Sequence, residues 1–246
     1  MLDALVIAGC LSGEKGDAGV SSLVDDLAAA VGADTVVRAR TGGRPVGASL
    51  PDVLSDLRRH GARRVLVATT HVADGRLQRA TADAVCAAAP DFDELCLAPP
   101  LLSGEKDHAA VAAALDEALP SAPGRVAALA GHRGPECAAA LAQLEEALHA
   151  RGRSDVLVGA PDLLRSRLRE RPERAVLLGP LLMALGHHAR QDVLEDLAAR
   201  LAANGLAVTP WPHSLAELPA VRALVIKHAM TQRDCPFVSF ARKELA

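Results

Sequence analysis

The sequence predicts an α/β fold made of two similar halves, each a parallel sheet doubly wound by helices. Three observations lead to this prediction: short β-rich runs alternate with Ala- and Leu-rich helical stretches, the same order of elements begins again after residue 123, and 50% of the 246 residues are hydrophobic. A chain of this length can bury one large core or two smaller ones. We expect a bilobal molecule with a pseudo-twofold axis, divided into residues 1–122 and 123–246.

The first half alternates strands with helices of clear periodicity. Leu23, Leu27 and Val31 recur at i, i+4 and i+8, which is typical of the buried face of a helix, and Gly32 is its stop signal. The other apolar runs are short and rich in Val and Leu, as expected for buried parallel strands. The expected elements are strand 4–8, helix 20–31, strand 35–38, helix 50–60 and strand 64–69.

The second half repeats this order. Its first strand begins about 121 positions after the first strand of the chain, which indicates a duplication. Residues 231–246 are expected to be either a docked tail or a contact for a partner. The expected elements are strand 125–130, helix 136–151, strand 155–158, helix 161–169, strand 174–178, helix 189–203 and a last strand 223–226.

Composition excludes several classes of function. The 27 basic residues are outnumbered by 30 acidic ones, the formal net charge is −3 and no basic run occurs, so nucleic acid is not an expected partner. Three Phe, one Trp and no Tyr leave too few rings for a base-stacking surface. No apolar run is long enough for a membrane span. The first residues lack the basic start of a signal peptide, so we expect a cytoplasmic protein.

Familiar nucleotide and hydrolase motifs are missing from the sequence. Gly42-Gly43 and Gly131-x-x-Gly134 have neither the G-x-G-x-x-G spacing nor the Walker ending, so no nucleotide cofactor is expected. No G-x-S-x-G elbow occurs, which disfavours a serine hydrolase. The five cysteines include no C-x-x-C pair and are expected to be reduced thiols rather than a zinc site or disulfides.

Histidine follows an expected strand at three places: His71, His132 and the pair His187-His188. A single loop histidine is usually a solvated polar residue, but three such places at the carboxyl ends of parallel strands favour a site. Two imidazoles and a carboxylate suit Co²⁺, Ni²⁺, Fe²⁺ or Zn²⁺. Asp162, after the next strand, is placed to supply the carboxylate. The alternative is that Asp162 only caps the helix that follows.

Three carboxylates follow His188 on the expected helix. Asp192, Glu195 and Asp196 stand at i, i+3 and i+4, so they share one helical face. Such a run is usually a solvated face with favourable charge near the helix N-terminus. If the face lined a cleft, it would instead pass hydrated cations inward or protons outward.

Four short segments, each after an expected strand, form a recognisable series: Thr69-Thr70-His71-Val72-x-x-Gly75, Pro100-Leu101-Leu102 with Asp107, Gly131-His132-Arg133-Gly134, and Pro180-Leu181-Leu182-Met183-x-x-Gly186-His187-His188-Ala189-x-x-Asp192. Together they resemble the anaerobic sirohydrochlorin cobaltochelatases of the cobalamin pathway, which are class II chelatases related to ferrochelatase. The similarity extends over the chain to about His228. The order of the four segments makes the resemblance fairly specific, although each one is short.

The resemblance implies two doubly wound halves with a tetrapyrrole in the cleft between them. It implies that His132 is a metal ligand and the base that removes pyrrole protons, and that Asp162 and His188 complete the metal site in residues 123–246. Asp162 stands where the family has Glu, and His187 stands where it has Asp. Because neutral imidazoles are required, activity is expected to fall as the pH drops through the histidine range.

Contacts to the substrate are expected mainly from the first half. Cys10, His71 and Leu102 lie in the segments that would shape the macrocycle pocket. Arg40, at the cleft edge of the second strand, would grip a peripheral carboxylate, and an ordinary surface arginine is the alternative.

The resulting hypothesis is an enzyme that inserts Co²⁺, or the related Ni²⁺ or Fe²⁺, into sirohydrochlorin or a similar carboxylate-rich tetrapyrrole without ATP. The metal is then a substrate, and no nucleotide, nucleic acid or membrane takes part. The alternative is a non-catalytic carrier of metal or tetrapyrrole on a degenerate chelatase scaffold. The sequence leaves the oligomeric state open, a homo-oligomer included.

Overall fold

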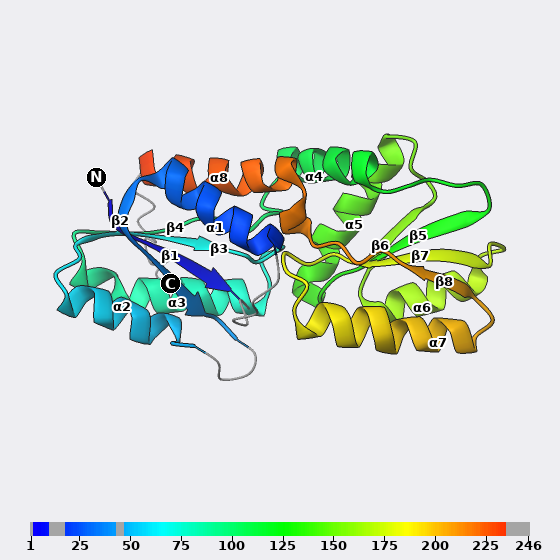
Figure 1. Ribbon diagram of the computed structural model, residues 1–246, viewed down its shortest axis with the longest axis horizontal. Helices are drawn as coiled ribbons and strands as arrows, with labels where there is room; N and C mark the ends of the chain where they lie inside the picture. Colours follow the sequence, from blue (N-terminus) through cyan, green and yellow to red (C-terminus); the bar gives the residue numbers. More distant parts are fainter. Residues whose placement is uncertain (1, 10–17, 43–46, 235–246) are drawn as a thin grey trace, which may run out of the picture.

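The computed structural model describes residues 2–9, 18–42 and 47–234, which form two four-stranded parallel sheets lying side by side (Figure 1). The first sheet has the strand order β2-β1-β3-β4, and the second has the order β6-β5-β7-β8. Both sheets therefore repeat one topology, and helices cover both faces of each. The α/β fold of two doubly wound parallel halves that the sequence predicts is confirmed.

The first lobe contains the first sheet. Helices α1 and α8 cover one face of this sheet, and α2 and α3 cover the other (Figure 1). Helix α2 begins where Ser49 accepts a hydrogen bond from the backbone N–H of Asp52, which satisfies one of its free donors. The elements are β1 (Leu2–Gly9), α1 (Ala18–Val31), β2 (Ala33–Arg40), α2 (Leu50–Arg59), β3 (Arg64–Thr69), α3 (Arg76–Ala88), a 3₁₀ turn (Ala89–Asp91), β4 (Glu94–Leu97) and α4 (Glu105–Ala118).

The second lobe contains the second sheet. Helix α5 packs on one face of this sheet, and α6, a π-helix and α7 pack on the other. The elements are β5 (Arg125–Ala130), α5 (Pro135–Ala150), β6 (Val156–Gly159), α6 (Pro161–Glu170), β7 (Ala175–Pro180), the π-helix (His188–Leu197), α7 (Ala198–Ala203), β8 (Ala207–Pro210), a 3₁₀ turn (Leu215–Glu217) and α8 (Pro219–Asp234).

Side chains alternate between the two faces of each central strand. In β1, Leu5 and Ile7 enter a buried cluster under α1 and α8, whereas Ala4, Val6 and Ala8 enter a separate cluster under α2. The cluster that contains Leu5 and Ile7 continues through α4 and α5 into the second lobe. One core thus runs through both lobes on the side of α1, α4, α5 and α8.

The strand expected at 223–226 is wrong, because these residues lie in the middle of α8. Val221, Leu224, Val225, His228 and Ala229 are its buried residues, at the spacing of one helical face. A run of four apolar residues does not distinguish a strand from a buried helical segment. The correct edge strand is β8, which pairs with β7 and which the sequence analysis missed.

Helix α8 crosses back from the second lobe to the first. It packs on α1 and α4, where Arg222 donates to Asp26 at 2.8 Å and Nε2 of His228 lies 3.2 Å from Oδ1 of Asp107. The division into residues 1–122 and 123–246 therefore does not fit α8, although it separates the strands of the two sheets. Of the tail 231–246, residues 235–246 lie outside the described part of the chain.

Candidate functional site

Two histidines of the second lobe stack on each other. His132 follows the end of β5, and His188 is the first residue of the π-helix after β7. Their ring centroids are 5.3 Å apart and the ring planes differ by 13°. The backbone before His132 runs so close to α5 that a Cβ at Gly131 would lie 2.9 Å from Cδ2 of Leu141. The strand ends thus bring together the two histidines that the sequence singles out.

His132 is electrically neutral at neutral pH. Burial, followed by the nearby positive charges that His188 and His71 would carry, lowers the pKa of His132 to about 4. A neutral imidazole keeps a lone pair for a metal ion or a proton. For His132, the loss of the neutral form lies near pH 4, well below the ordinary histidine range that the sequence analysis assumed.

His188 is oriented by a carboxylate one helical turn away. Its Nδ1 contacts Oδ2 of Asp192, so the proton of a neutral ring lies on Nδ1 and the lone pair lies on Nε2. Carboxylates commonly orient metal-binding histidines in this way. His187 is exposed and is not part of this arrangement. His188 and Asp192 both lie in the π-helix, a rare geometry that is frequent at functional sites.

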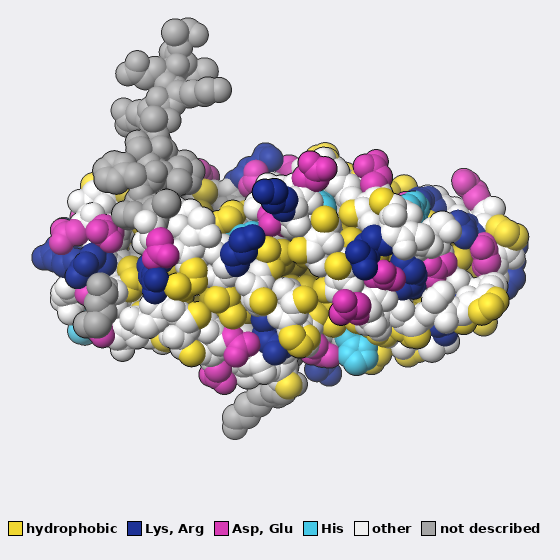
Figure 2. All heavy atoms as spheres, turned by 90° about the horizontal axis from the view of Figure 1, so that it is seen from above, with side chains coloured by type: hydrophobic (Ala, Val, Ile, Leu, Met, Phe, Trp, Pro, Cys, Tyr) yellow, Lys and Arg dark blue, Asp and Glu magenta, His cyan; other side chains and the backbone are white. Residues whose placement is uncertain are grey.

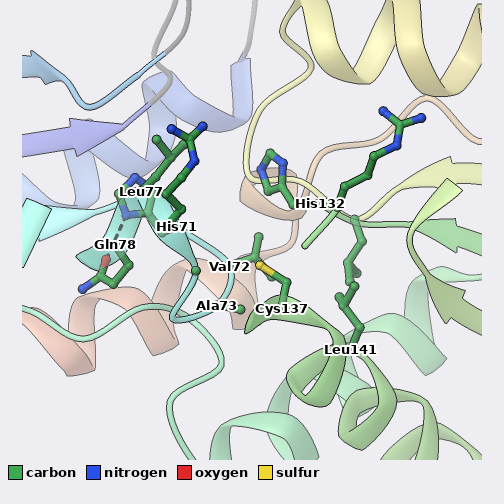
Figure 3. Close-up of a pocket in the computed structure, with 12 residues that line it drawn as sticks. His71, Val72, Ala73, Leu77, Gln78, His132, Cys137 and Leu141 are labelled. Atoms are coloured by element: carbon green, nitrogen blue, oxygen red, sulfur yellow. Dashed lines mark hydrogen bonds between the residues drawn. The ribbon is translucent and has the colours of Figure 1, made fainter. Parts of the chain in front are cut away.

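A cavity opens between the two lobes beside His132 (Figure 3). His71 and Gln78 face it from the first lobe, His132 faces it from the second, and Cys137 lies between them. The lobes approach closely here, since a Cβ at Gly75 would lie 2.7 Å from Sγ of Cys137. The lining residues are His71, Val72, Ala73, Gly75, Arg76, Leu77, Gln78, His132, Arg133, Cys137, Leu141 and Leu181.

His71 is held at the cavity by two hydrogen bonds. Its Nδ1 lies 2.8 Å from Oε1 of Gln78, and its Nε2 lies 2.9 Å from Oγ1 of Thr41. An amide oxygen only accepts, so Nδ1 donates and Nε2 accepts from the threonine hydroxyl. Burial lowers the pKa of His71, and the bond to Gln78 opposes this shift only in part. A neutral imidazole therefore faces the cavity from the first lobe as well.

Asp162 lies in a separate, polar pocket between α6 and the π-helix. Its Oδ2 accepts from Nε of Arg133 at 3.3 Å, and its Oδ1 lies 4.0 Å from Nη2 of Arg165. In the part of the chain that the structure describes, no three His, Cys, Asp or Glu side chains are grouped closely enough to hold a metal ion. His132 and His188 are thus together, and Asp162 is paired with arginine instead. The pocket is lined by Arg133, Pro161, Asp162, Arg165, Asp192, Asp196, Leu197 and Arg200.

The remaining expected substrate contacts have different outcomes. Cys10 lies outside the described residues. Arg40 ends β2, where its Nε donates to the carbonyl of Gly47 at 3.5 Å, and it lines neither cavity. Leu102 is 4% exposed, belongs to the shared core and does not line the cavity, although its backbone N–H donates to the carbonyl of Val72, which does. Of the expected first-half contacts that the structure describes, only His71 lines the cavity.

The partners that orient the histidines are not evident from local sequence patterns. Thr41 and Gln78 bind His71 from segments that carried no recognisable pattern. The i, i+4 spacing of His188 and Asp192 is consistent with their pairing on one helical face. Asp192 and Asp196 line the polar pocket and Glu195 does not, so the expected single acidic face is split.

Charged side chains of both signs are mixed on the face of the molecule that is seen from above (Figure 2). In the view from above, Lys and Arg side chains are interspersed with Asp and Glu over both lobes (Figure 2). Among the residues that the structure describes, no helix is both long and apolar enough to span a bilayer.

The sequence matches a family model described as cobalt chelatase (CbiK) over residues 36–233. It is also 31% identical over 187 residues to the sirohydrochlorin cobaltochelatase of Salmonella typhimurium, an alignment that covers 71% of this chain and 70% of the relative.

Solved structures with the same fold include the sirohydrochlorin chelatase SirB from Bacillus subtilis subspecies spizizenii in complex with cobalt. Its TM-score is 0.66 at 13% identity, and the match covers 96% of this chain and 97% of SirB. A second is CbiX, described as the terminal enzyme of sirohaem biosynthesis in denitrifying bacteria, with a TM-score of 0.59 at 20% identity, covering 93% of this chain and 98% of CbiX. These structures establish the shared bilobal fold.

Proposed function

The chain belongs to the cobalt chelatase (CbiK) family, and we propose that it inserts Co²⁺ into sirohydrochlorin or a closely similar carboxylate-rich tetrapyrrole. The observation that carries this proposal is the stacked pair of His132 and His188 at the edge of the interlobe cavity. A chelatase needs a metal-binding base beside a cleft, and this pair supplies two imidazoles there. No nucleotide is part of the proposed reaction.

Insertion exchanges two pyrrole protons for one divalent ion. His132 is neutral at neutral pH because its pKa is about 4, so it can bind the ion or accept a proton without first losing one. The same low pKa lets an accepted proton pass on to solvent, which leaves the ring ready for the next cycle. The apolar wall formed by Val72, Leu77 and Leu181 would contact the macrocycle.

We propose that the incoming ion is held by His132 and His188, and that Asp162 joins them as the third ligand. Imidazole and carboxylate ligands suit Co²⁺, and also Fe²⁺ and Ni²⁺, so the donor set alone does not select one metal. Orientation of His188 by Asp192 favours this role, because it presents Nε2 as the donor.

Turnover distinguishes this enzyme from a carrier. The full chain is mixed with sirohydrochlorin and excess Co²⁺, and the visible absorption band of the macrocycle is followed. A chelatase converts many equivalents of tetrapyrrole per chain, whereas a carrier stops at one. A plateau at one equivalent would contradict the proposed function.

Replacing His188 by alanine is expected to weaken Co²⁺ binding at least about tenfold, because it removes one of two clustered imidazole donors. The matched control is His187→Ala, which removes the adjacent exposed imidazole and is expected to leave the affinity within about twofold. Calorimetric titration with Co²⁺ measures both variants. Equal losses of Co²⁺ affinity in the two variants would contradict a specific role for His188 as the metal ligand.

Replacing Asp192 by asparagine is expected to lower Co²⁺ affinity about 10- to 100-fold, because the carboxylate that orients His188 becomes a neutral amide. Asp196→Asn is the control: Asp196 lines the same pocket, but its recorded contact is with Gln191 at 3.3 Å. The same titration measures both variants. If both lose affinity equally, bulk charge in the pocket is responsible and the orienting role is wrong.

A further inference from the structure

Arg133 stands between the interlobe cavity and the polar pocket of the second lobe. It follows His132 directly, and its side chain lines both the interlobe cavity and the polar pocket beside α6. The proposed tetrapyrrole enters the first of these cavities, and Asp162 lies in the second. One guanidinium is therefore within reach of a ligand on one side and of the proposed third metal ligand on the other.

Each oxygen of Asp162 faces an arginine, and one of them accepts a hydrogen bond. Arg133 donates to Oδ2 at 3.3 Å, and Arg165 lies 4.0 Å from Oδ1. In this arrangement the carboxylate does not join His132 and His188, in agreement with the absence of a three-ligand group among the described residues. The metal site is incomplete while Arg133 holds Asp162.

The ion pair of Arg133 with Asp162 is suited to exchange. The two side chains are 55% and 61% exposed, and ion pairs this exposed contribute little stability. Only Nε of Arg133 is engaged; within the described residues its terminal nitrogens have no hydrogen-bond partner. They are free to bind an incoming carboxylate in the bidentate geometry that arginine favours.

We propose that Arg133 couples the two substrates of the reaction. A carboxylate of the tetrapyrrole takes Arg133 away from Asp162, and the released Asp162 then binds the metal beside His132 and His188. One carboxylate replaces another on the guanidinium, so its charge stays compensated. This inference rests on the proposed function, and it makes Arg133 a positioning residue, because it acts on the metal through Asp162.

Coupling of this kind is reciprocal. If the tetrapyrrole carboxylate raises the affinity for metal, the metal raises the affinity for the tetrapyrrole by the same factor. The protein without macrocycle then binds Co²⁺ only through its two imidazoles. The third ligand becomes available when the acceptor ring is already in the cleft.

The first test measures Co²⁺ affinity by calorimetry, with the full chain and no tetrapyrrole, in a double-mutant cycle of Arg133→Ala and Asp162→Ala. Arg133→Ala is expected to raise the affinity about tenfold, since Asp162 is freed. Asp162→Ala is expected to cost about tenfold more in the Arg133→Ala background than in the wild type. Equal costs in both backgrounds would overturn the proposal, because Asp162 would then bind metal whether or not Arg133 is present.

Arg200→Ala is the charge-matched control. Arg200 lines the same polar pocket, and it forms no hydrogen bond or ion pair with Asp162 among the described residues. Its replacement by alanine removes the same single positive charge as Arg133→Ala. It is expected to change Co²⁺ affinity by less than about threefold, as expected for a screened exposed charge. If Arg200→Ala tightens Co²⁺ binding as much as Arg133→Ala, the general field of the pocket explains the effect and the proposal fails.

The second test is kinetic. Arg133→Ala is expected to raise the KM for sirohydrochlorin about tenfold, with kcat within about threefold, and Arg133→Lys is expected to restore part of the loss because it keeps the charge without the fork. An unchanged KM would overturn the role of the substrate carboxylate. If the wild type shows no turnover at all, the proposed function fails, and the Co²⁺ cycle still decides whether Arg133 restrains Asp162.

Discussion

Replacing His132 by alanine is expected to abolish metal insertion, lowering kcat by about a thousandfold or more. The change removes a metal donor and the proposed proton acceptor together, and a positioned base alone contributes about 10²- to 10⁴-fold. His132 lies in a loop and is absent from the three buried clusters that hold the sheets, so the fold should survive. Initial rates of cobalt-sirohydrochlorin formation measure the effect, and a melting curve checks the fold.

His187→Ala is the matched control for this experiment. It removes an exposed imidazole from the loop that carries His188 and is expected to keep the rate within about threefold. Turnover that persists in His132→Ala but disappears in His187→Ala would show that His187, and not His132, is the catalytic histidine.

Replacing Glu145 by glutamine is expected to have the largest effect on stability. Glu145 of α5 accepts two hydrogen bonds from Arg167 of α6, at 2.8 and 2.6 Å, and one from the backbone N–H of Val158 at 2.6 Å. Val158 lies in β6, an edge strand, so one carboxylate joins two helices to the edge of the sheet. Removing the charge leaves Arg167 without its partner, which should cost about 2–3 kcal/mol of unfolding free energy.

The measurement is chemical or thermal unfolding, where this loss corresponds to a fall in Tm of about 5–10 °C. Glu146→Gln, at the adjacent exposed position, is the control and is expected to be within about 0.5 kcal/mol of the wild type. A Glu145→Gln protein as stable as Glu146→Gln would show that the ion pair only offsets its own desolvation.

The contribution of Glu145 to the free energy of unfolding should depend on pH. Burial raises the pKa of Glu145, but the bonds from Arg167 and Val158 outweigh burial and hold the pKa below its ordinary value. A lowered folded pKa stabilises the protein above the unfolded pKa of about 4.3, and this contribution disappears as the pH falls through the folded pKa. The stability difference between wild type and Glu145→Gln should therefore be full at pH 7 and should narrow in acid.

Local patterns were sufficient to predict most of the fold. Apolar runs such as 64–69 and 125–130 are bounded by turn signals and became β3 and β5 at those residues. The run 223–226 failed because its helical partners, Val221 and Ala229, lie on both sides of a segment that looks like a strand when taken alone. Periodicity over the longer window, not the short run, carries the information.

In the candidate site, too, the local features could be predicted from the sequence and the long-range contacts could not. Strand ends are local features, so the sequence predicts His132 and His188 in the loops that follow two parallel strands, and the structure stacks them. The partners of Asp162 are not local: Arg133 is 29 positions away and belongs to another loop. No spacing predicts such a pair. Asp107, quoted for the family resemblance, likewise contacts His228 across 121 positions and joins α4 to α8.

The core shared by the lobes determines how the protein melts. Leu5 and Leu66 of the first sheet belong to the same buried cluster as Leu129 and Leu177 of the second, so neither sheet can lose its packing on that side alone. Two similar units would otherwise unfold one after the other; here they form one cooperative unit. The layers beneath α2 and α6 have separate clusters and can open locally. The slowest-exchanging amide protons should therefore be found on both sheets, under α1 and α5.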